Sequence, residues 1–87
     1  MLGSVEIRYT RSALKALLRV PASEAKRIRG KIGQYARDPP SLAGNVKKLK
    51  GRPGYRLRVG NYRVIFDRDG VVMEVLHIGH RGSVYED

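Results

Sequence analysis

Two short runs of alternating apolar and basic residues flank Gly60-Asn61, and they constrain the fold more than any other part of the chain. Glycine followed by asparagine favours a two-residue turn that needs positive φ, so we predict a β-hairpin over residues 55–66. Such a turn fixes the register of the two strands. Arg58 is then opposite Arg63, and Arg56 is opposite Ile65. The other face of the hairpin is apolar and collects Tyr55, Leu57, Val59, Tyr62, Val64 and Phe66.

The three arginines of this hairpin share its second face with Ile65. Like charges that lie directly opposite one another destabilise a pair of strands. The arrangement therefore costs stability unless an anion lies across it. A phosphodiester backbone is the natural candidate, and a solvated basic surface is the alternative.

The segment before the hairpin predicts one strand and two amphipathic helices. Residues 5–9 alternate in polarity, which predicts a strand with Val5, Ile7 and Tyr9 on its inner face. Thr10 or Ser12 can cap a first helix, which Pro21 ends. In that helix the apolar positions are Leu14, Leu17 and Leu18, and the outward positions are Arg11, Lys15 and Arg19. A second helix is expected from an N-cap at Ser23 to about Arg37, with an apolar stripe of Ala25, Ile28, Ile32, Tyr35 and Ala36. Gly30 and Gly33 within it suggest close packing or fraying.

The rest of the chain predicts a basic connection and a final strand. Residues 41–53 are interpreted as a connection, and residues 71–78 as a strand that follows a tight turn at Asp69-Gly70. A two-residue turn there would pair Phe66 with Met73 and Val64 with Val75. A bulge would instead exchange the two faces of the last strand. The expected fold is α+β with the order β-α-α-β-β-β, in which both helices pack on one face of a small, mostly antiparallel sheet.

Length and composition restrict the class of protein. The 87 residues form a single expected domain, and without cysteine neither a disulfide framework nor a thiolate metal site is available. We expect no metal or other cofactor, and a soluble, cytoplasmic protein without a membrane span. The net charge of +10 is concentrated in the middle of the chain, because residues 39–66 hold seven basic and no acidic side chains. Such a distribution favours contact with nucleic acid.

The chain resembles the RelE/ParE superfamily of bacterial toxins. The resemblance rests on Leu49-Lys50-Gly51, on the hairpin of residues 55–66, on Ile78-Gly79-His80-Arg81 and on Val84-Tyr85. It implies a toxin of a toxin–antitoxin system, and the RelE-type ribosome-dependent mRNA endonucleases more than the ParE-type gyrase inhibitors. The implied partners are an antitoxin, the ribosome and mRNA, with operator DNA contacted only through the antitoxin complex. The family's catalytic surface maps to Arg56, Arg58, Arg63, Arg81 and Tyr85.

Metal-free RNA cleavage needs a base, a group that stabilises the transition state and an acid. Arg58 and Arg63 suit the transition state because guanidinium groups bind phosphate oxygens in a bidentate way, while Arg56 and Arg81 would hold the backbone. RelE has lysines where this chain has Arg56 and Arg58, and an arginine cannot serve as a general base. His80 is a candidate for proton transfer, or else a solvated loop residue. Tyr85 could stack on a base, transfer a proton or simply anchor the tail.

A second basic group lies upstream of the hairpin and is predicted to bind structured RNA. It consists of Lys47, Lys48, Lys50 and Arg52. Two other functions stay open at this point. One is gyrase inhibition without cleavage, and the other is a catalytically inactive module in which the arginines only hold phosphate.

Overall fold

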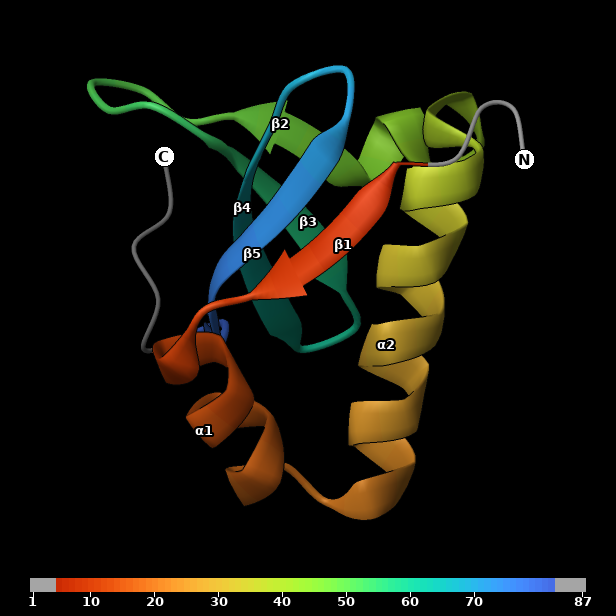
Figure 1. The fold of residues 1–87 in the computed structure, drawn as a ribbon. Coiled ribbons are helices and arrows are strands. Elements are labelled where there is room, and N and C mark those ends of the chain that lie inside the picture. Colours follow the sequence, from red (N-terminus) through yellow and green to blue (C-terminus); the bar gives the residue numbers. More distant parts are fainter. Residues whose placement is uncertain (1–4, 83–87) are drawn as a thin grey trace.

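The computed structural model describes residues 5–82 (Figure 1). The chain begins with strand β1 (Glu6–Tyr9), followed by helices α1 (Arg11–Arg19) and α2 (Ala22–Arg37) and the 3₁₀ segment η1 (Pro39–Asn45). Four strands complete it: β2 (Val46–Lys48), β3 (Tyr55–Val59), β4 (Tyr62–Arg68) and β5 (Val72–His80). The α+β class is as predicted, and so is the order of the predicted elements, β1-α1-α2-β3-β4-β5. The short strand β2 was not predicted, and it lies within the segment that was interpreted as a connection.

The five strands form one sheet in the order β1-β5-β4-β3-β2. Only β1 and β5 run parallel, and the three other pairings are antiparallel. The β3–β4 register is the predicted one, with Arg58 opposite Arg63 and Arg56 opposite Ile65. Gly60 has a φ of 57° and Asn61 does not have positive φ. This is the pattern of a turn with glycine at its first central position.

The β4–β5 register differs from the predicted one. Phe66 pairs with Val75 and Val64 pairs with Ile78, and the register shifts between Ile65 and Phe66. Arg68 pairs with Met73, so four residues rather than two separate the paired positions at this turn. The bulge lies within the strands and not in the turn. Beyond it the two faces of β5 are exchanged relative to the predicted register, and His80 pairs with Tyr62.

The two helices and the sheet enclose a common apolar core. The predicted stripe of α2 is buried in full: Ala25, Ile28, Ile32, Tyr35 and Ala36. Val5, Ile7 and Tyr9 pack against this core, as expected. In α1 the prediction was partly wrong, because Ala13 and Leu17 are buried while Leu18 is 82% exposed. α1 packs mainly on β5, at the end of the sheet where β5 finishes, and α2 runs along β1 and β3 (Figure 1).

The helix ends are determined by local hydrogen bonds and by proline. Thr10 is the N-cap of α1, and its Oγ1 accepts a hydrogen bond from the backbone N–H of Ala13 at 3.1 Å. α2 starts after Pro21 without a side-chain cap, so the predicted cap at Ser23 is wrong. Asp38 ends α2 immediately before Pro39, as expected. Gly30 has open space around it, and therefore close packing does not explain this glycine. Within residues 5–82, neither helix is long and apolar enough to cross a bilayer.

Candidate functional site

The candidate site lies where β3 and β4 join at the Gly60–Asn61 turn. We call Arg58, Arg63 and Arg81 the arginine cluster. Arg58 and Arg63 face each other across the two strands, and Gly79 is next to Arg63 on β5, where it contributes no side chain. Arg81 is attached to the turn because its backbone N–H donates to the carbonyl oxygen of Asn61 at 2.7 Å. The turn and the end of β5 thus bring together three residues that are well separated in sequence.

The three arginines on the predicted basic face of the hairpin differ in solvent exposure, and the sequence pattern did not indicate this difference. Arg58 is exposed, whereas Arg63 retains 6% and Arg56 9% of its accessible surface. Nη1 of Arg63 donates to the carbonyl oxygens of Gly60 at 3.1 Å and of Tyr62 at 3.0 Å. The predicted face is therefore not uniformly open to solvent. Arg58 is thus accessible to solvent, while Arg63 is buried and holds the turn through its two hydrogen bonds.

Arg27 of α2 is a further basic residue at this turn. Its guanidinium lies so close to Gly60 that an added Cβ there would be 2.9 Å from Nη1 and 3.2 Å from Cζ. Arg27 also lies 3.7 Å from the carboxylate of Glu24. No sequence pattern links residue 27 to residue 60, because their proximity arises only from the packing of α2 beside β3. Arg27 could therefore not be predicted as a residue of this site.

His80 lies at the same end of the sheet but on its other side. It pairs with Tyr62, and the two rings meet edge to face with 5.6 Å between their centroids. The backbone N–H of Gly82 lies 3.5 Å from Nδ1 of His80. The change of face follows from the bulge in β5. His80 is thus near the Gly60–Asn61 turn along the strand, but its side chain does not share the face of Arg58 and Arg63. Tyr85 lies outside the described residues.

The second predicted basic group divides into two parts. Lys47 is opposite Arg56 in the β2–β3 register and thereby extends the arginine face by one strand. Lys48 lies over the ring of Tyr55, with Nζ 5.4 Å from the ring centroid. Lys50 and Arg52 are exposed in the loop that enters β3 at Tyr55, at the opposite end of that strand from Gly60. The structure therefore does not place them with the arginine cluster.

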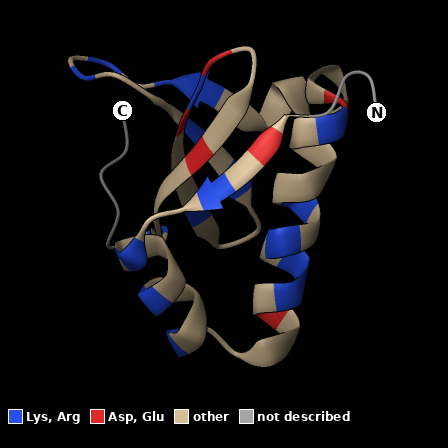
Figure 2. Ribbon diagram, viewed as in Figure 1, with Lys and Arg blue, Asp and Glu red and all other residues tan. Residues whose placement is uncertain are grey.

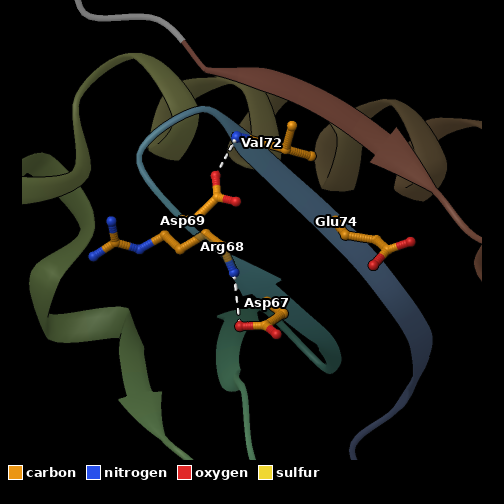
Figure 3. A pocket seen from close by; sticks show the side chains of 5 residues that line it. All are labelled: Asp67, Arg68, Asp69, Val72 and Glu74. Atoms are coloured by element: carbon orange, nitrogen blue, oxygen red, sulfur yellow. Dashed lines mark hydrogen bonds between the residues drawn. The ribbon is translucent and has the colours of Figure 1, made fainter.

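Charge is unevenly distributed over the molecule (Figure 2). Basic residues follow both helices and the region of β2, whereas acidic residues are few and lie on β1, β5, the β4–β5 loop and the ends of α2. A small hollow of about 150 Å³ at that loop is lined by Asp67, Arg68, Asp69, Val72 and Glu74 (Figure 3). Oδ1 of Asp69 accepts hydrogen bonds from the backbone N–H groups of Val72 and Val71 at 2.8 and 2.7 Å. These bonds lower the pKa of the Asp69 carboxyl, with the bond from Val72 having the larger effect. They stabilise the loop and lie at the far end of β4 from the arginine cluster.

Comparison with known proteins identifies the family. A family model described as the ParE toxin of the type II toxin–antitoxin system parDE matches residues 7–85. Toxin RelE3 of Methanocaldococcus jannaschii is 32% identical over 85 residues, which cover 94% of this chain and 97% of that protein. The toxin in the RelE–RelB complex from Pyrococcus horikoshii OT3 has a TM-score of 0.76 at 25% identity, covering 93% of this chain and 99% of that chain. The RelB–RelE complex from Methanococcus jannaschii gives 0.72 at 30% identity, with coverage of 91% and 95%. This chain belongs to the RelE/ParE superfamily of toxins of type II toxin–antitoxin systems.

Proposed function

We propose that this toxin is a metal-independent endoribonuclease that cleaves mRNA on the ribosome and so inhibits translation. The observation that carries the proposal is the exposed Arg58 directly opposite Arg63 beside the Gly60–Asn61 turn. Two opposed cations destabilise the free sheet, and a bound phosphate would remove that cost. The likeness to proteins named RelE supports a nuclease over a binding module.

The proposed reaction is an attack of the ribose 2′-oxygen on the adjacent phosphorus. The new bond joins the 2′-oxygen to phosphorus, and the bond between phosphorus and the 5′-oxygen breaks. The products are a 2′,3′-cyclic phosphate and a 5′-hydroxyl, with one proton moving from the 2′-oxygen to the 5′-oxygen. Arg58 would contact the phosphate oxygens, on which negative charge increases in the transition state. Arg63 would add positive charge behind it and hold the turn in place. Arg81, which is exposed, would position the backbone, and Arg56, which keeps only 9% of its accessible surface, would add positive charge beneath it.

Proton transfer requires a different kind of side chain. Arginine keeps its proton near neutral pH, so neither Arg58 nor Arg63 can act as the base. His80 stays our candidate, because it lies at the same end of the sheet as the arginine cluster. Its side chain reaches the substrate only if the RNA passes over the end of the sheet and contacts both faces. Tyr85 is proposed to assist, by stacking or by proton transfer.

The proposed macromolecular partners follow from the charge and from the related complexes. We propose that a cognate antitoxin inhibits this toxin, since the similar solved structures from two archaea are complexes with RelB. Residues 39–66 hold seven basic and no acidic side chains, which favours an acidic partner segment. Lys47, Lys48, Lys50 and Arg52 are proposed to dock on ribosomal RNA. Operator DNA would be contacted only through the antitoxin complex, and the proposed location is the cytoplasm.

The decisive experiment compares wild-type protein with Arg58→Ala in a purified translation system. Wild type should cut a reporter mRNA on ribosomes far faster than the same mRNA alone, leaving 5′-hydroxyl and cyclic phosphate ends. Arg58→Ala should lose most of this activity. Lys26→Ala, an exposed change on α2, is the control that should keep it.

The family model that matches the chain is described as a ParE toxin, which favours gyrase inhibition as the second candidate function. A supercoiling assay with purified gyrase therefore runs beside the translation assay. Inhibition of supercoiling without any RNA cleavage would overturn the nuclease proposal. Cleavage at equal rates with and without ribosomes would overturn only its ribosome dependence.

A further inference from the structure

Helix α1 carries three exposed cations in one row and no acidic residue. Arg11, Lys15 and Arg19 follow one another at intervals of four, so they lie on the same face of the helix. Each like-charge pair at this spacing destabilises a helix by about 0.2–0.5 kcal/mol. Arg11 is also in the first turn, where the helix dipole disfavours a positive charge. The row weakens α1 in isolation, and an anionic ligand along it would compensate.

A groove runs beside this row, between α1 and the end of β5. It consists of two adjoining hollows of about 360 and 280 Å³, which share Ala16, Arg19 and His77. The first hollow also includes the cations at the start of α1 and is completed by Arg11, Ser12 and Lys15. The second reaches Tyr62 and His80 beside the Gly60–Asn61 turn. We call the two hollows together the α1 groove. It leads from the start of α1 to the end of the sheet where the arginine cluster lies.

The walls of the α1 groove are fixed to one another by hydrogen bonds at the bulge. Thr10, the N-cap of α1, donates through Oγ1 to the carbonyl oxygen of Leu76 at 2.8 Å, and its backbone N–H donates to Val75 at 3.0 Å. Oγ of Ser12 lies 3.4 Å from Nδ1 of His77. The elements on the two sides of the groove, α1 and β5, are therefore held together by these bonds. Its shared floor is the small side chain of Ala16.

We propose that the α1 groove binds a single strand of RNA and guides it to the arginine cluster. The three cations would contact successive phosphates, and the rings of His77, Tyr62 and His80 would offer surfaces on which bases stack. A strand in this groove approaches the end of the sheet from the side of His80. That route gives the candidate proton-transfer residue access to RNA that also contacts Arg58. The inference rests on the proposed function and adds the path of the substrate to it.

The test measures binding separately from cleavage. A fluorescent 12-nucleotide RNA with 2′-O-methyl riboses cannot be cut by 2′-oxygen attack, so anisotropy reports binding alone. The groove variant Arg11→Gln, Lys15→Gln, Arg19→Gln is compared with the matched variant Lys26→Gln, Arg29→Gln, Arg37→Gln on α2. Both variants lose three positive charges, all from exposed positions on helices.

The salt dependence of the dissociation constant separates a groove from a general effect of charge. Three lost phosphate contacts should reduce the slope of log K against log salt by about 2, because each contributes about 0.7 for a single strand. At 0.1 M salt this corresponds to roughly a hundredfold weaker binding for the groove variant. The α2 variant should change less than about threefold. Equal losses in the two variants would mean that net charge alone matters and would overturn the proposal.

A third variant, Ala16→Leu, fills the floor of the groove without changing the charge. It should weaken binding at least tenfold while its melting temperature shows that it folds. Wild-type affinity in a folded Ala16→Leu protein would overturn the proposal even if the charge variants behaved as expected. The proposed function is tested separately, by cleavage. If the wild-type protein binds the methylated RNA through the groove but cleaves no RNA, the nuclease proposal is refuted and the proposal of RNA binding in the α1 groove still holds.

Discussion

Arg58 and Arg63 are equivalent in the sequence pattern, but the structure predicts opposite effects on stability when each is replaced by alanine. Arg58 is exposed, and its removal relieves the repulsion across the β3–β4 pair. The relief is worth about 0.2–1 kcal/mol. Arg58→Ala should therefore melt at the wild-type temperature or a few degrees above it. The pattern alone predicts the same gain for Arg63→Ala.

The contacts of Arg63 reverse this expectation. Nη1 donates to the carbonyl oxygens of Gly60 and Tyr62, and the residue is 6% exposed. A hydrogen bond from a charged donor contributes about 1.5–3 kcal/mol. In Arg63→Ala, water can hydrogen-bond to the carbonyl oxygens that Arg63 leaves, and the repulsion between Arg58 and Arg63 is removed. Both effects offset part of the lost hydrogen-bond energy, so we expect the free energy of unfolding to fall by about 2 kcal/mol. For a chain of this size the melting temperature should fall by about 8–16 °C.

The assay is thermal unfolding of the two single variants and of the double variant, followed by circular dichroism. The two changes should not be additive, because the residues face each other directly. Arg63→Lys keeps the charge without the planar donor geometry and should fall between wild type and alanine. Equal melting temperatures for Arg58→Ala and Arg63→Ala would refute the assignment of Arg63 as a structural support of the turn.

Three further predictions concern the turns and α2. Gly60→Ala should lower the free energy of unfolding by about 1–2 kcal/mol, because φ is 57° there and the new Cβ would be 2.9 Å from Arg27. In denaturant unfolding, adding Arg27→Ala should restore only the part of this loss that comes from the steric contact. Gly30→Ala should raise the free energy of unfolding by about 0.5–1 kcal/mol, because the position is helical and has open space for a Cβ. A decrease in stability would contradict this assignment. The pKa of Asp69 is lowered by the backbone N–H of Val72, so the stability it contributes is present above about pH 4 and is lost as the pH falls further. Wild type should accordingly melt at a higher temperature than Asp69→Ala, and this difference should be largest at pH 6 and decrease below pH 4.

The parts of the fold that were predictable are those determined by local sequence. The Gly60–Asn61 turn sets the β3–β4 register because a two-residue connection leaves no freedom in pairing. The stripe of α2 follows from its helical spacing. The β4–β5 register failed because Asp69-Gly70 is part of a longer loop, and nothing local marks the shift between Ile65 and Phe66.

The candidate site was predictable as a set of residue types but not as an arrangement. Alternation placed Arg58 and Arg63 opposite one another, yet alternation cannot tell an exposed arginine from one that donates to the turn. The face on which His80 lies could not be predicted, because it depends on a bulge several residues earlier. Arg27 approaches Gly60 only through tertiary packing. Burial and proximity of this kind are set by the whole fold rather than by any segment.

The position of β5 has a consequence for how the protein folds during synthesis. β5 lies between β1 and β4 in the sheet, although it follows all the other described strands along the chain. The parallel pairing of Glu6 with Val72 joins residues from opposite ends of the described sequence. Closing this long loop costs conformational entropy before the contacts of the pairing can compensate for it. While the chain is being made, β1 and α1 therefore have no strand to pack on. We expect the nascent toxin to stay open until β5 is available, and an antitoxin present at that stage would meet it before the sheet has closed.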